Sequence, residues 1–159
     1  MNVNGILGKN EYEANRFAAQ IMLVTILFVA LCYILDVVGI FIVPLTTMTI
    51  ASAVAAILLV IPAVLIFIFK QQGRWVKYVT VTVATLMVGS MSMFLTYHTV
   101  ILYVYAIAIA SLFFSRSLSW YTVIISIIVL SLSQIFAVYA GGIEDKNFIG
   151  LYDTVIYGV

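Results

Sequence analysis

Long apolar runs separated by short polar stretches make up almost the whole chain. A helix needs about 20 predominantly apolar residues to cross a membrane core that is ~30 Å thick. The pattern therefore predicts an all-α, polytopic transmembrane helical bundle with five complete spans and the start of a sixth, behind a polar leader at 1–16. The expected spans cover residues 17–43, 48–69, 78–95, 100–114 and 121–139, and the partial span covers 148–159.

Breaks within the apolar pattern indicate where the chain turns. Residues 78–114 would form a helix of roughly 55 Å, too long for one crossing, so we expect a hairpin near Thr96–Thr99. Pro44 is expected to end the first span, since the residue before a proline is pushed out of the α region. Pro62 should kink the second span or free a carbonyl. Residues 11–16 are either a short helix capped by Asn10 or a solvated tail.

Composition supports a membrane environment. The chain of 159 residues is 65% hydrophobic and 8% charged, with a mean hydropathy of +1.25, far from the values of soluble domains. A net charge of +1 argues against nucleic acid as a partner. A lone Cys32 provides neither a disulfide framework nor a cysteine metal site. No catalytic motif is present, so we expect neither an enzyme nor a cofactor, with any catalytic domain beyond Val159.

The distribution of basic residues predicts the orientation. Cytoplasmic loops of membrane proteins are enriched in lysine and arginine. Lys70, Arg74, Lys77 and Arg116, with Lys9 and Arg16, flank one set of span ends, whereas the other set has only Lys146. The N-terminus and the loops at 70–77 and 115–119 are therefore expected in the cytoplasm.

Small and hydroxyl-bearing residues indicate which surfaces pack together. Ala51 and Ala55, like Ser52 and Ala56, have the small-xxx-small spacing that allows close helix approach. The third span is rich in such residues, and we expect its small and polar face to be buried. Its members are Thr80, Thr82, Thr85, Gly89, Ser90 and Ser92.

Asp36 is the one carboxylate inside a complete expected span. An ionised aspartate at the bilayer centre is unfavourable by ~2.5–3.5 kcal/mol on insertion scales, so such a residue is a functional candidate by default. It is expected to bind a cation, carry a proton or meet a ligand's amine. The alternative is that it reaches the outer headgroup region or bonds neighbouring hydroxyl groups.

Other polar side chains in the outer halves of the spans could form a ligand pocket with Asp36. The candidates are Tyr97, His98, Tyr103 and Gln134. The alternative for the tyrosines is an aromatic belt at the membrane–water interface. His98 is the only histidine, and a metal site at a lone histidine is not expected.

The layout resembles the N-terminal six-helix sensor region of bacterial membrane signalling proteins. The resemblance rests on the leader Asn10-Glu11-Tyr12-Glu13-Ala14-Asn15-Arg16, on compact spans with short loops, on the turn Thr96-Tyr97-His98 and on Ser111-Leu112-Phe113-Phe114-Ser115. In those proteins the module feeds a GGDEF cyclase, histidine kinase, chemoreceptor or phosphatase domain.

The resemblance implies an input module in the bacterial inner membrane, with the sixth span continuing past Val159. Its expected partners are the lipid bilayer, a small-molecule ligand from outside and a second copy of the chain. Two alternatives stay open. The chain is a small-substrate transporter or its binding subunit, or it is a short protein whose tail lies on the outer surface.

Overall fold

The fold is built from helices alone in the residues that the structure, a computed structural model, describes: 3–40, 44–71, 73–95 and 102–139. Four of these helices are long and apolar enough to span a membrane: 10–37, 45–68, 75–93 and 116–137. The elements in chain order are α1 (Val3–Val37), α2 (Leu45–Ala63), η1 (Val64–Ile68), α3 (Trp75–Leu95), α4 (Tyr103–Ser111) and α5 (Arg116–Tyr139).

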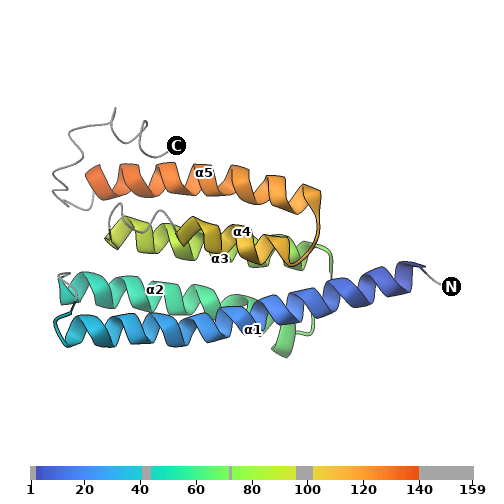
Figure 1. Ribbon diagram of the computed structural model, residues 1–159, viewed down its shortest axis with the longest axis horizontal. Coiled ribbons are helices and arrows are strands. Elements are labelled where there is room, and N and C mark those ends of the chain that lie inside the picture. Colours follow the sequence, from blue (N-terminus) through green and yellow to red (C-terminus); the bar gives the residue numbers. More distant parts are fainter. Residues whose placement is uncertain (1–2, 41–43, 72, 96–101, 140–159) are drawn as a thin grey trace.

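The long helices lie side by side, and α3 is the central one (Figure 1). It packs against α2 on one side and against α4 and α5 on the other, and it also contacts α1. Its buried side chains include Val81, Ala84 and Val88, which join the main apolar cluster with Leu59 of α2 and Ile109 of α4. The helices α1, α2, α4 and α5 are thus arranged around α3, which is rich in small and hydroxyl-bearing residues.

The first helix extends further at its N-terminus and ends earlier than expected. Residues 11–16 belong to α1, so they are helical, and Asn10 lies inside the helix rather than at its cap. The helix ends at Val37, not at Pro44, because Gly39 adopts a φ of +84°. The Gly39 amide donates to the Asp36 carbonyl (2.8 Å) and the Ile40 amide to the Leu35 carbonyl (3.0 Å), which is a Schellman termination.

Pro62 widens its helix without ending it. The α-helical pattern continues to Ala63 and is followed at once by the π-helical segment η1. The Phe69 amide donates to the Val64 carbonyl at 3.1 Å, the longer loop of a π turn. The chain is thus helical on both sides of Pro62, and the irregular segment is confined to Val64–Ile68.

The expected fourth span is a much shorter helix. The helix α4 has nine residues, or about 13.5 Å, and is not among the helices long enough to cross a membrane. It ends in a tight turn in which the amides of residues 112–114 bond three residues back and Phe114 has a φ of +46°. The Leu118 amide then bonds the Ser115 hydroxyl (3.4 Å), and this cap starts α5 at Arg116, before the expected Tyr121.

The predicted small surfaces are buried in part, since Ser52, Ala56, Thr82 and Ser90 are half-buried. Ala51 and Ala55 are fully buried on one face of α2, and Thr80 and Thr85 are buried on α3. A side chain at Gly89 would collide with Val129 of α5, so this glycine permits the approach of the two helices.

Several predicted features lie outside the described residues. They are the hairpin at Thr96–Thr99 with Tyr97 and His98, the loop at 141–147 with Lys146, and the partial span 148–159.

Candidate functional site

The bundle has two ends that differ in their polar contacts. One end contains the N-terminal half of α1, the η1–α3 connection and the α4–α5 connection, and we call it the Lys77 end (Figure 1). The Asp36 end contains the C-termini of α1, α3 and α5 and the N-termini of α2 and α4. The basic residues predicted to determine the topology all lie at the Lys77 end: Lys70, Arg74, Lys77 and Arg116.

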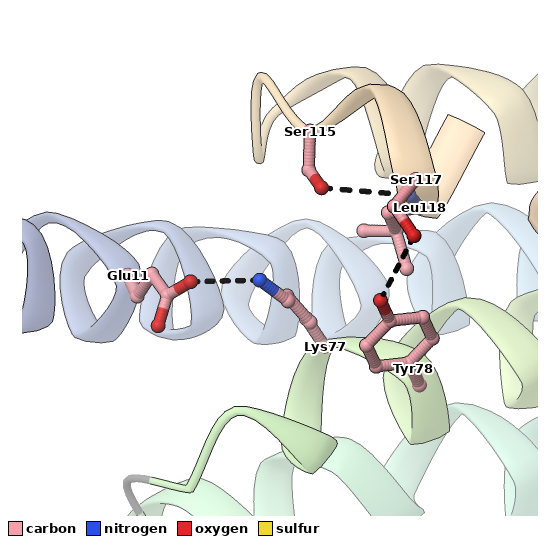
Figure 2. A network of polar contacts seen from close by, with 6 residues as sticks. All are labelled: Glu11, Lys77, Tyr78, Ser115, Ser117 and Leu118. Carbon is pink, nitrogen blue, oxygen red and sulfur yellow. Dashed lines mark hydrogen bonds and ion pairs between the residues drawn. The ribbon is translucent and has the colours of Figure 1, made fainter. Parts of the chain in front are cut away.

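An ion pair joins α1 to α3 at the Lys77 end. The Lys77 ammonium donates to Glu11 Oε1 at 2.7 Å (Figure 2). The Lys77 side chain is 12% exposed and that of Glu11 35% exposed, so the pair is only partly open to water. Arg16 lies on the same part of α1, and its guanidinium is 6.0 Å from the centre of the ring of Phe67, a residue of η1. The N-terminal segment is therefore attached to the bundle.

Tyrosine contacts join α3 to α5 at the same end. The Tyr121 and Thr82 hydroxyls are 2.7 Å apart, and the rings of Tyr78 and Tyr121 meet edge to face with centroids 5.2 Å apart. The Tyr78 hydroxyl is also 3.5 Å from the Ser117 hydroxyl (Figure 2). These hydroxyls face one another across two helices, so most of the polar groups at this end are satisfied.

Asp36 lies in the last turn of α1, at the opposite end. Its side chain is 7% exposed, and neither carboxylate oxygen has a hydrogen-bond or ionic partner within the described residues. Burying an ionised carboxylate without a partner is strongly unfavourable. Asp36 therefore combines burial with unused hydrogen-bonding capacity, as a binding residue does.

The structure places Tyr103 and Gln134 at the Asp36 end but joins neither to Asp36 by a hydrogen bond. The Gln134 amide donates to the Ser92 hydroxyl at 3.0 Å and so links α5 to α3. The Tyr103 hydroxyl is buried and makes no hydrogen bond in the described part of the chain. The Ser133 hydroxyl, which donates to the Leu130 carbonyl (2.8 Å), lies near the Tyr103 hydroxyl but not in hydrogen-bonding geometry with it.

No hydrogen bond joins Asp36, Tyr103 and Gln134, the described members of the pocket that the sequence predicts, to one another. Gln134 has a structural partner, whereas Asp36 and Tyr103 each have an unpaired buried group. Tyr97 and His98 lie outside the described residues. Asp36 has no acidic, histidine or cysteine neighbours arranged as a metal centre within the described ranges. The Asp36 carboxylate alone can bind a proton, or a cation that keeps part of its hydration shell.

A separate cavity of about 170 Å³ lies between α1, α2, α3 and α4. Sequence reasoning missed it, because its walls come from four helices and its residues have ordinary apolar character. The local signs are residues at helical spacing on one face: Met87 and Met91 on α3, and Thr25, Val29 and Cys32 on α1. The other lining residues are Phe28, Met48, Val88, Leu102 and Tyr105.

Comparisons with protein-family models, with curated proteins and with solved structures found no match for this chain. Its function must therefore be argued from the bundle itself.

Proposed function

We propose that this chain is a membrane-embedded input module that responds to a cation or proton at Asp36. The observation that carries the proposal is the buried carboxylate with two oxygens that lack partners in the described residues. A cation that binds there would recover the electrostatic energy that burial removes. The proposed orientation has the N-terminus and the Lys77 end in the cytoplasm, with Asp36 near the outer surface of a bacterial inner membrane. In this arrangement α4 belongs to a short fourth crossing, which makes five crossings in total.

The helix α1 connects the proposed site to the opposite end. Asp36 and Glu11 lie on this one helix, 25 positions apart, which corresponds to about 37 Å. Glu11 in turn holds Lys77 of α3. A small movement of α1 caused by a ligand at Asp36 would therefore reach the ion pair. A ligand shifts such an equilibrium only by its differential affinity for the two states.

Unbroken helices favour signalling over transport. Transporters of many families bind their substrates at discontinuous helices near the membrane midplane. In the described residues α1, α3 and α5 are continuous, and the one disturbance, η1, lies at the Lys77 end rather than beside Asp36. The transporter alternative is nevertheless tested directly by the experiment below.

The tryptophans provide a reporter of this coupling. The chain has two, Trp75 and Trp120, and both lie at the Lys77 end on α3 and α5. We expect their emission to change when purified protein in nanodiscs is titrated separately with H⁺, Na⁺, K⁺, Mg²⁺ or Ca²⁺. For one of these cations the change should saturate, and Asp36→Asn should abolish it, since this variant keeps size and hydrogen bonding but removes the charge.

The matched control is Glu13→Gln, which removes a carboxylate from an exposed position on the same helix. It should leave the titration unchanged. A response that is equal in Asp36→Asn and in the unmodified protein would overturn the proposal, as would the absence of any response. Cation-dependent uptake into proteoliposomes that requires Asp36 would favour transport instead.

A further inference from the structure

The cavity between α1, α2, α3 and α4 is suited to an apolar ligand. Its lining side chains are aliphatic, aromatic or sulfur-containing, apart from Thr25 and Tyr105. The Thr25 hydroxyl lies 2.9 Å from the Ile21 carbonyl, to which it donates, and 3.0 Å from the Tyr105 hydroxyl. Because the single Thr25 proton is used on Ile21, Tyr105 donates to Thr25. Both hydroxyls are thus engaged with protein groups, and the wall offers a ligand no free hydroxyl donor.

The size of the cavity limits the ligand to a small molecule. An apolar cavity of about 150 Å³ stays dry and binds benzene. The volume here, about 170 Å³, is similar. It accommodates one six-membered ring with a methyl substituent but not a fused ring system with branched substituents. Water is disfavoured, since a bound water needs two to four polar partners.

The sulfur atoms favour an aromatic ring over a saturated one. Met48 of α2 and Met87 and Met91 of α3 line the cavity, with Cys32 of α1 facing them. Thioether sulfur makes favourable contacts with the edges of aromatic rings, and methionine adapts its shape to the occupant. Three methionines from two helices can therefore surround one ring.

An entrance to the cavity lies on the outer surface of the bundle. Phe28 of α1 and Leu102 before α4 line the cavity and are both exposed. In a chain that spans a membrane, such an apolar rim faces the acyl chains. A ligand that partitions into the bilayer would reach the cavity sideways, without crossing a polar surface.

We propose that this cavity is a binding site for a single neutral aromatic ring of the size of benzene or toluene, entering from the lipid phase. The site is distinct from Asp36, which does not line it. The inference is independent of the proposed cation response, and each can fail without the other.

Methionine methyl NMR with toluene as the probe tests this site. The chain has six methionines, and three of them line the cavity. Protein labelled with ¹³C at the methionine methyls is titrated with toluene in nanodiscs. The ring current should shift the signals of Met48, Met87 and Met91 along one saturable isotherm. Met93 lies on the face of α3 that meets α5 and does not line the cavity, so it should not follow this isotherm and is the internal control.

Two further arms separate a built site from partitioning into lipid. The bulky 1,3,5-triisopropylbenzene should produce no saturable shift, because it exceeds the cavity. Val88→Phe fills the cavity with a ring and should abolish the toluene shifts, and Cys32→Leu, which adds bulk from the α1 wall, should weaken toluene binding at least tenfold. Linear shifts that are equal at Met93 and Met87, equal responses to both hydrocarbons, or no shift at all would overturn the proposal.

Discussion

The two ends of the bundle differ in their buried charged and phenolic groups, although the hydrogen bond between Gln134 and Ser92 shows that the Asp36 end also has satisfied polar groups. At the Lys77 end, Glu11 pairs with Lys77, and Thr82 bonds Tyr121, so contacts between side chains join α1 to α3 and α3 to α5. At the Asp36 end, the Asp36 carboxylate and the Tyr103 hydroxyl are buried without partners in the described ranges. The separation is not complete, because Asn15 Oδ1 at the Lys77 end is also unpaired. That oxygen belongs to a neutral amide, which is much less unfavourable to bury than a charge.

The difference indicates which end is built for stability and which for binding. A satisfied polar network holds helices in one arrangement, whereas an unpaired buried group leaves binding energy for a ligand. A folded bundle can tolerate one such group when apolar packing elsewhere is extensive. Here the fully buried residues Leu59, Val81 and Val88 provide that packing between the two ends.

The largest expected effect is a difference in cysteine labelling between the two ends, because they are proposed to lie on opposite sides of the membrane. In a Cys32→Ala background, Ser117→Cys at the Lys77 end should react with a membrane-impermeant maleimide only after cell lysis. Thr46→Cys at the Asp36 end should react in intact cells whose outer membrane has been permeabilised. Both positions are exposed, so labelling depends on the side of the membrane.

Both variants should label to the same extent after lysis, which controls for reactivity. Labelling of the Ser117 position in intact cells would reverse the proposed orientation. Asp36 would then face the cytoplasm, and an external signal could not be its ligand.

A smaller effect is expected when a carboxylate is replaced by an amide at each of the two ends. Glu11→Gln replaces the charge-assisted bond to Lys77 with a neutral one, and we expect the free energy of unfolding to fall by about 1–2 kcal/mol. Asp36→Asn should leave the free energy of unfolding unchanged or raise it, because burial of a carboxylate is relieved. Unfolding by SDS in mixed micelles measures both.

Glu13→Gln, at an exposed position on α1, serves as the control for this pair and should have no effect. If Asp36→Asn destabilised the protein as much as Glu11→Gln, Asp36 would have a stabilising partner in the folded chain. The contrast between the ends would then be wrong.

The periodic and compositional features of the chain predicted most of the fold. The expected spans 48–69, 78–95 and 121–139 correspond closely to α2 with η1, to α3 and to α5. Helix ends were less predictable, since they depend on local backbone geometry. Gly39 is a recognisable C-terminal signal that ends α1 before Pro44, but the tight turn at Phe114, a residue with no preference for a positive φ, has no such signature.

Candidate site residues were harder to predict than helices. Asp36 could be selected because one carboxylate in an apolar run stands out, and its burial agrees with that selection. The bond from Gln134 to Ser92 could not be predicted, because pairing between helices depends on their rotation about their axes. The same limit explains the cavity: Thr25 and Tyr105 are 80 residues apart and meet only in the packed bundle.

The smallest expected effect compares two tyrosines, one at each end. Tyr121→Phe removes the hydroxyl that bonds Thr82 at 2.7 Å but keeps the edge-to-face contact with Tyr78. Hydrogen bonds between membrane helices contribute about 0.6 kcal/mol on average and up to about 1.7 kcal/mol, so a loss of roughly 1 kcal/mol is expected. Tyr103→Phe removes a buried hydroxyl that has no partner in the described residues, and stability should stay the same or rise. SDS unfolding of both variants, with Thr82→Val as a check that the Tyr121 effect comes from this one bond, measures the difference. An equal loss for Tyr103→Phe would show that its hydroxyl is satisfied in the folded protein, and the Asp36 end would then differ from the Lys77 end only in its carboxylate.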